Sequence, residues 1–172
     1  MDPNVLHNIS YGMFIVSSHK DGAFNGQIAN TVFQITSVPV TIAISINKKN
    51  LTHEYIEASR RFSVSILEED TPLPFIGKFG FKSGSQEDKF KDTNFKVLES
   101  GCPAVIEHSI GYIEAEVISC FDCGTHTLFI GCMKDSAILK EGRPMTYDYY
   151  HNVKKGTTPS KAPTFIRREK QG

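Results

Sequence analysis

The sequence predicts a mainly β fold, an all-β barrel with a few short peripheral helices. Many short segments rich in Val, Ile, Thr and Phe are separated by turn residues, and the helical stretches are few and short. Long amphipathic helices between the strands, which a doubly wound α/β fold requires, are missing. The 172 residues are expected to form a single domain over 1–172, which can bury about 70% of its unfolded surface without a disulfide or a metal.

The first elements follow from their turn and cap residues. Asp2 can cap a helix and Pro3 fits its first position, so a short helix is expected up to about Ser10. A strand follows over 13–16, with turn signals at 20–22 and 25–26. Two strands with a corner at Pro39 are predicted between residues 32 and 46.

The strand over 40–46 shows the clearest alternation. Large apolar side chains share one face and small ones the other: Val40, Ile42, Ile44 and Ile46 against Thr41, Ala43 and Ser45. A period of two predicts a strand with one packed face. The small face leaves room for a flat ligand or a neighbouring subunit.

The remaining elements are again short. A helix is expected over 51–58, with Asn50 or Thr52 as its cap, then a strand over 62–67 and a helix over 72–79. The stretch 79–89 is predicted to be a functional or mobile loop. Strands return over 112–119 and 125–134, and residues 146–172 are expected to form an extended C-terminal arm over the surface or over a partner subunit.

Charge and composition exclude several classes of protein. Lys+Arg and Asp+Glu are both 19, so the formal net charge is zero. This neutrality argues against nucleic-acid binding and against a polybasic membrane-surface protein. We find no apolar run long enough for a membrane span and no secretory signal at the N-terminus. Four cysteines are too few for a disulfide scaffold. We therefore expect a cytoplasmic protein with reduced thiols.

The stretch 45–52 is the most informative one chemically, because the chain there leaves a strand and enters a helix. Free backbone N–H groups and the positive end of a helix favour an anion. Asn47, Asn50 and Thr52 can add hydrogen bonds and Lys48 a charge, so a phosphate site is one interpretation. The alternative is a polar turn followed by an ordinary N-cap.

Two other patterns are weaker. In the run 25–31, Gln27, Asn30 and Thr31 could bind the polar edge of a ring, although a hairpin turn explains the run better when it is taken by itself. Cys120 and Cys123 form a CxxC pair, but a zinc or iron site needs four ligands, so no metal is predicted and edge or buried thiols are the alternative. Taken alone, Lys89 and Arg143 are expected to be solvated charges and His126 a structural residue at the start of a strand.

The ordered set of stretches resembles the flavin reductase-like family, with its FMN-binding split barrel. The resemblance extends from about residue 10 to 165 and is carried by these segments: 12–16, 24–31, 38–39, 45–52, 79–90 and 124–131. The ending, 145–151 with 162–165, is similar to a narrower group, the flavin domain of high-molecular-weight rubredoxins and the flavoredoxins.

The resemblance implies a homodimer that holds FMN near its interface and uses NADH or NADPH as reductant. It implies that His126 lines the cleft where nicotinamide or the acceptor stacks, and that Lys82 or Lys89 attracts the nucleotide. The implied cofactor-binding residues are Asn25, Gln27, Ile28, Ala29, Asn30, Thr31, Ser45, Asn47, Lys48, Asn50, Thr52, Phe81 and Lys89.

The function implied is an NAD(P)H-dependent FMN oxidoreductase of the flavin reductase type, which passes electrons onward. A rubredoxin, another flavoprotein, free flavin or an iron chelate could accept them. One alternative is an FMN electron-transfer protein, flavoredoxin-like, which a partner protein reduces instead of NAD(P)H. A second alternative is a flavin-free barrel that serves as a binding module.

Overall fold

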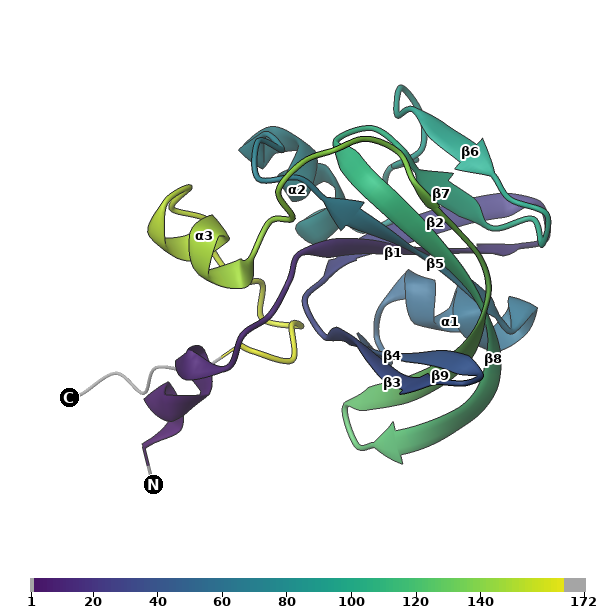
Figure 1. The fold of residues 1–172 in the computed structure, drawn as a ribbon, viewed down its shortest axis with the longest axis horizontal. Coiled ribbons are helices and arrows are strands. Elements are labelled where there is room, and N and C mark those ends of the chain that lie inside the picture. The colour runs from purple at the N-terminus through teal and green to yellow at the C-terminus, as the bar shows by residue number, and fades with distance from the viewer. Residues whose placement is uncertain (1, 166–172) are drawn as a thin grey trace.

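The computed structural model describes residues 2–165 and has a mostly β architecture with short helices around it (Figure 1). The 3₁₀ helix η1 (Pro3–Asn8) precedes the elements β1 (Phe14–Lys20), β2 (Ala23–Ala29), β3 (Val32–Ser37), β4 (Val40–Asn47), α1 (Leu51–Ser59), β5 (Arg61–Leu67), α2 (Leu73–Gly80), β6 (Phe95–Val97), β7 (Pro103–Val105), β8 (Ser109–Cys123), β9 (His126–Ile138) and α3 (Tyr147–Asn152). None of the helices within residues 2–165 has the length and apolar character needed to cross a membrane.

Seven strands form one antiparallel sheet in the order β2-β1-β5-β8-β9-β4-β3. The sheet curls on itself, and the long strands β8 and β9 continue from its upper to its lower half (Figure 1). Strands β2 and β3 are its two edges, which leaves the barrel split between them. A two-stranded sheet of β6 and β7 lies outside. The predicted fold class, mainly β with a few short peripheral helices, is confirmed.

Both faces of the sheet are packed, because different elements cover each face. Inside the curl, Val16, Ile44, Phe62 and Phe129 form a buried cluster that Ile56 of α1 completes. Outside it, a second buried cluster joins β1 and β5 to α2 and the C-terminal region; its buried members are Met13, Ile15, Leu67, Ile76, Phe79, Phe90, Val105, Met145 and Tyr150. On the small face of β4 this packing buries Thr41 (5% exposed) and Ala43, whereas Ser45 near the end of the strand lines the cavity described below.

Two local predictions were wrong. Residues Asn25 and Gly26 are not a turn but lie inside β2, opposite Ser18 and Ser17. The hairpin turns four residues earlier, at Asp21–Gly22, where both residues have positive φ as a type I′ turn requires. The C-terminal arm is not extended throughout, because α3 forms within it and Thr146 caps that helix by accepting a hydrogen bond from the Tyr149 N–H. The part of the predicted arm beyond residue 165 lies outside the described residues.

Candidate functional site

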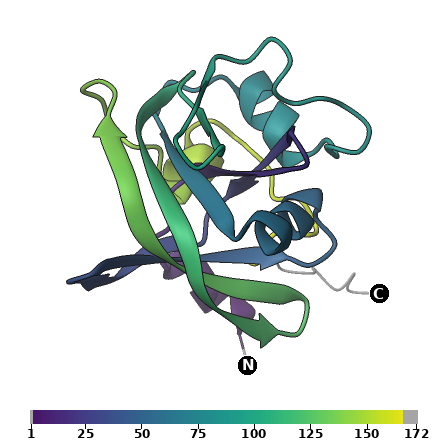
Figure 2. The ribbon, with the colours of Figure 1, turned by 90° about the vertical axis from the view of Figure 1, so that its right-hand side faces the viewer.

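A cavity of about 380 Å³ lies where the end of β2, the end of β4, the start of α1 and the loop after α2 meet the C-terminal region. This volume falls within the range of small-molecule and cofactor sites. Residues 157–163, which we call the C-terminal strap, line one side of the cavity. The strap is part of the yellow segment in Figures 1 and 2.

Most of the predicted cofactor-binding residues come together here. The cavity is lined by Asn25, Gln27, Ile28, Ala29, Asn30, Ser45, Asn47, Asn50, Thr52, Phe81 and Lys89. Thr31 and Lys48 do not line it, and neither does His126. Much of the loop predicted over 79–89 lines the cavity, namely residues 79–84 and Lys89.

Gln27 carries the clearest sign of a missing partner. Its side-chain Oε1 is buried and has no hydrogen-bond partner among the described residues. A buried acceptor without a donor costs about 1–3 kcal/mol. Because Gln27 also lines the cavity, this acceptor is a candidate partner for a ligand that offers an N–H.

Asn25 connects three of the elements around the cavity. It is 3% exposed, and its Nδ2 donates a 2.8 Å hydrogen bond to Oγ1 of Thr52 at the start of α1. Gly84 approaches from the loop after α2, so closely that a Cβ there would lie 1.9 Å from the Asn25 Oδ1. Asn25 therefore shapes the cavity by holding β2, α1 and the loop together.

Lys89 is not the solvated charge that its sequence context alone predicts. Its side chain is buried, and Nζ donates to the carbonyl oxygens of Gly26 at 3.0 Å and Phe79 at 3.2 Å. Burial lowers the pKa of this ammonium group to about 8. Since an ammonium has three N–H donors, one is left for a ligand in the cavity.

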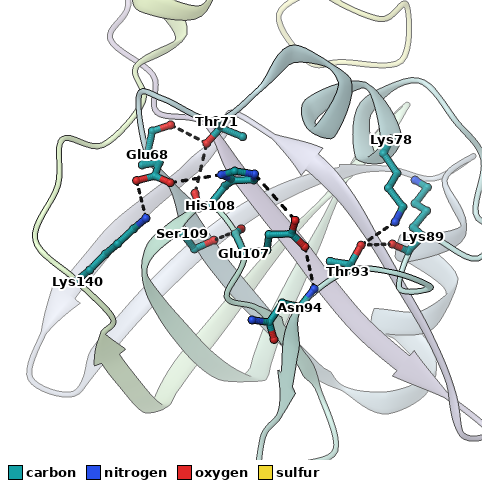
Figure 3. Close-up of polar contacts among 10 residues, drawn as sticks. All are labelled: Glu68, Thr71, Lys78, Lys89, Thr93, Asn94, Glu107, His108, Ser109 and Lys140. Atoms are coloured by element: carbon teal, nitrogen blue, oxygen red, sulfur yellow. Dashed lines mark hydrogen bonds and ion pairs between the residues drawn. The ribbon is translucent and has the colours of Figure 1, made fainter.

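The backbone of Lys89 is held by a short chain of hydrogen bonds, which Figure 3 shows. The Thr93 hydroxyl donates to the Lys89 carbonyl at 2.9 Å, and Lys78 Nζ donates to that hydroxyl at 2.7 Å. These bonds fix the segment that presents the ammonium group to the cavity.

The start of α1 provides the predicted anion-binding feature. Asn50 is the N-cap residue with an extended backbone, but its side chain makes no capping hydrogen bond. The N–H groups of the first turn are thus not capped by it, and the positive end of the helix dipole faces a cavity that Asn50, Leu51 and Thr52 line.

Lys48 is placed differently from the prediction. Its Nζ lies 2.5 Å from Oδ1 of Asp122 on β8, and its backbone N–H donates to the Thr125 carbonyl. These contacts hold Lys48 against the β8–β9 hairpin, away from the cavity, and the next residue, Lys49, lines the cavity instead.

His126 lies behind the strap and not in the cavity wall. Its Nε2 donates to the backbone carbonyl of Lys161 at 3.3 Å, and its Nδ1 lies 2.9 Å from the Thr125 hydroxyl. His126 therefore does not line this cavity, and its place beside bound nicotinamide or an acceptor, which the resemblance implies, stays a prediction.

The cavity is strongly cationic although the chain is neutral. Lys49, Lys82, Lys89 and Lys161 line it, and no Asp or Glu is among its described lining residues. Only Lys82 of these four forms an ion pair within residues 2–165, with Glu87 at 2.6 Å. An anionic ligand suits such a site.

The strap and its Lys161 were not predicted as site residues. The Thr, Pro and Ser residues of 157–163 are typical of any surface loop, and no local pattern separates a loop that lines a cavity from one that does not. Lys49 was missed because sequence spacing cannot decide which of two adjacent lysines turns inward.

A second polar cluster in Figure 3 lies apart from this cavity. Glu68 is 2.7 Å from Lys140 Nζ and 3.5 Å from His108 Nδ1. The Lys140 hydrogen bond is the main reason that the pKa of the Glu68 carboxyl is lowered. These contacts join the turn after β5 to the start of β8 and the end of β9, and we assign them a structural role.

The CxxC pair lies on an exposed part of β8, away from the cavity. Cys120 and Cys123 both lie on strand β8 and are exposed, and their odd separation places them on opposite faces of the strand. All four cysteines are free thiols. No group of His, Cys, Asp and Glu in the described part of the chain could hold a metal ion.

Comparison with known proteins agrees with this architecture. The model of the flavin reductase like domain matches residues 6–156. The chain is 54% identical over 171 residues to a high molecular weight rubredoxin of Moorella thermoacetica, covering 99% of this chain and 75% of the relative. It is 47% identical over 166 residues to a ferric-chelate reductase (NAD(P)H) of Archaeoglobus fulgidus, covering 96% of this chain and 98% of the relative.

A solved structure, the flavin reductase PheA2, superposes with a TM-score of 0.70 at 27% identity, covering 85% of this chain and 93% of that one. The family model spans most of the chain, and the curved sheet, the split edge and the cavity are all present in the structure. The chain therefore belongs to the flavin reductase-like family of flavin-binding oxidoreductases.

Proposed function

We propose that this protein binds FMN in the cavity and is an NAD(P)H-dependent oxidoreductase that passes electrons onward to an acceptor. The observation that carries the proposal is a cationic cavity without a carboxylate among its described lining residues; Gln27, whose buried Oε1 has no partner among the described residues, also lines it. Its volume of about 380 Å³ lies within the range of cofactor sites. When bound, FMN supplies a ring that accepts a hydride from reduced nicotinamide and passes electrons on singly or in pairs.

The protein's own part in this chemistry is binding and electrostatics. Gln27, with the backbone of Ile28 to Asn30, would bind the polar edge of the flavin ring. Asn50 and Thr52 at the start of α1, together with Lys49, would bind its phosphate. The ammonium group of Lys89 would favour a flavin that gains negative charge on reduction. Hydride transfer needs no general base, so orientation and charge are sufficient roles for these residues.

The use of NAD(P)H is supported by the name of the Archaeoglobus fulgidus relative, ferric-chelate reductase (NAD(P)H), at 47% identity over almost its whole length. The test is an anaerobic titration of the FMN-loaded protein with NADH and, separately, NADPH. We expect at least one of them to bleach the flavin absorption at about 450 nm. If neither nucleotide bleaches it while dithionite does, the protein is not an NAD(P)H-dependent reductase.

The second candidate is an FMN electron-transfer protein that a partner protein reduces. Its support is the Moorella thermoacetica relative named high molecular weight rubredoxin, of which the aligned part of this chain covers 75%. A rubredoxin is accordingly the electron acceptor to test first. Mixing the dithionite-reduced protein with oxidised rubredoxin in a stopped-flow instrument should reoxidise the flavin. Reduced flavin that persists in this experiment would exclude rubredoxin as an acceptor.

We also propose a homodimer, which the apolar edge of the sheet supports. On and beside the edge strand β3, Phe33 is 51%, Ile35 is 44% and Val38 is 90% exposed. Exposed apolar side chains on an edge strand are typical of an interface. Sedimentation velocity should give twice the mass of one chain, and Phe33→Asp with Ile35→Asp should convert the dimer to a monomer. A wild-type protein that sediments as a monomer would exclude the dimer.

A further inference from the structure

The C-terminal strap is tied to the rest of the protein at its beginning, in its middle and just beyond its end. At the beginning, Gly156 packs so tightly on the Tyr150 ring of α3 that a Cβ would lie 2.1 Å from it. The Gly156 carbonyl accepts a 2.9 Å hydrogen bond from Nδ1 of His151, and the Thr157 carbonyl accepts one of 3.0 Å from the Tyr150 hydroxyl. Only glycine fits this first anchor without displacing the ring.

The other two anchors use residues of the cavity itself or of its edge. In the middle of the strap, the Lys161 carbonyl accepts from Nδ2 of Asn47 at 3.2 Å and from Nε2 of His126 at 3.3 Å. Just after the strap, the Thr164 hydroxyl accepts a 2.7 Å hydrogen bond from Nδ2 of Asn30, which is 5% exposed. The same hydroxyl donates to the Tyr147 hydroxyl at 2.9 Å.

The strap between these anchors is itself constrained. The Ala162 N–H donates to the Pro159 carbonyl at 3.0 Å, forming a tight turn. Pro159 and Pro163 have a fixed φ, which removes much of the conformational freedom that a loop of this length would have. A segment held in this way and lining the cavity along its whole length is a fixed wall of the site.

The Lys161 side chain adds charge to that wall. Lys161 lines the cavity, and repulsion between its ammonium group and that of Lys89 helps to lower the pKa of Lys89. Neither lysine forms an ion pair within residues 2–165. Two cations that repel each other and line one cavity without a described carboxylate are both stabilised by an anion bound in that cavity.

We propose that the C-terminal strap is part of the flavin site: Lys161 selects a flavin that bears a phosphate, and the anchors keep this flavin bound through turnover. The inference rests on the proposed function, since it concerns FMN in the same cavity. Its consequence is that electrons leave to an acceptor that approaches the bound flavin, because reduced FMN is not released as a product.

The first experiment compares FMN with riboflavin, which has the same ring and no phosphate. Fluorescence titrations give the Kd of each ligand for wild type and for Lys161→Met, which keeps the Lys161 carbonyl and its hydrogen bonds. We expect the Kd for FMN to rise about tenfold and the Kd for riboflavin to stay the same. An unchanged Kd for FMN, or an equal rise for both ligands, would overturn the role of Lys161. Lys154→Met is the matched control, since Lys154 follows α3 but does not line the cavity.

The second experiment measures how fast FMN leaves. Thr164→Val removes the hydroxyl that binds Asn30 and Tyr147, whereas Thr164→Ser retains it. After rapid dilution into flavin-free buffer, FMN should leave Thr164→Val at least about tenfold faster than wild type, with Thr164→Ser close to wild type. Circular dichroism of each variant verifies that it is folded. Equal release rates in the three proteins would overturn the retaining role of the strap.

The two proposals fail in different ways. If wild type binds neither FMN nor riboflavin, the proposed function is wrong. If wild type binds FMN tightly but Lys161→Met and Thr164→Val behave like wild type, the proposed function stands and only the role of the strap is wrong.

Discussion

The side-chain amide of Asn30 donates a 2.7 Å hydrogen bond to the hydroxyl of Thr164, which lies 134 residues further along the chain. Asn30 follows β2 and lines the cavity, and Thr164 directly follows the strap, which also lines it. A single bond thus connects the two sequence regions between which the candidate flavin site is formed.

This bond should be measurable as a coupling between the two residues. We predict that Asn30→Ala and Thr164→Val each lower the free energy of unfolding of the FMN-free protein by about 1 kcal/mol. The double variant should lose less than the sum, with a coupling energy of about 1 kcal/mol. Urea denaturation of the four proteins tests this, and strictly additive losses would show that the two side chains do not interact in solution.

The buried ammonium group of Lys89 should make stability depend on pH. Its pKa falls from 10.5 to about 8 on folding, so between these values the unfolded state binds more protons than the folded state. Stability therefore rises with pH in this window. We predict that the stability difference between wild type and Lys89→Met shifts in favour of wild type by up to about 3 kcal/mol from about pH 8 to pH 10.5.

Urea denaturation of both FMN-free proteins across this range gives the difference directly, and groups that titrate equally in both cancel. The packing lost in the variant is a constant offset, and any pH dependence of the hydrogen bonds to Gly26 and Phe79 comes from the same Lys89 titration. A pH-independent difference would mean that Lys89 keeps an ordinary pKa in the folded protein.

Replacing Gln27 should weaken FMN binding without lowering the stability of the FMN-free protein. Gln27→Leu removes a buried acceptor that has no partner among the described residues, so the FMN-free variant should be as stable as wild type or up to about 2 kcal/mol more stable. The same change should raise the Kd for FMN about tenfold, because the flavin loses a hydrogen bond. Thermal unfolding and fluorescence titration measure the two effects.

Gln34→Leu is the matched control for this prediction. Gln34 lies on β3, is exposed and does not line the cavity, so its replacement should leave the affinity for FMN unchanged. Gln27→Leu with wild-type affinity would place the flavin ring elsewhere.

The cysteines should react in an order set by their burial. Cys120 and Cys123 are exposed and should react with a thiol reagent such as DTNB in the native protein. Cys102 is fully buried, and burial raises the pKa of its thiol to about 11, so it should react only after unfolding. Replacing both Cys120 and Cys123 by Ser should leave FMN binding and NAD(P)H oxidation unchanged, because neither residue lines the cavity. Loss of activity in that variant would reveal a redox role for the pair.

Much of the fold could be predicted because its signals are local. The alternation over 40–46 and 62–67 corresponds to β4 and β5, and the polar residues before 51 correspond to the start of α1. The wrong turn prediction at 25–26 arose because the same short pattern is compatible with a turn and with a strand. Asn25–Gly26 is typical of a turn, but Asp21–Gly22 already turns the hairpin, and pairing with β1 keeps Asn25 and Gly26 in the strand.

The sequence by itself determined the fold class, the family resemblance and most of the residues around the cavity, since these depend on periodicity, caps and the order of short motifs. Only the tertiary structure decided the direction of each charged side chain and the place of the C-terminal region. Lys48 forms an ion pair with Asp122, whereas Lys49 lines the cavity. Lys89 is buried and donates to the carbonyls of Gly26 and Phe79, and Lys161 lines the cavity from the C-terminal region. The physical reason is that these placements depend on contacts between residues far apart in sequence, and the spacing of residues along the chain does not reveal such contacts.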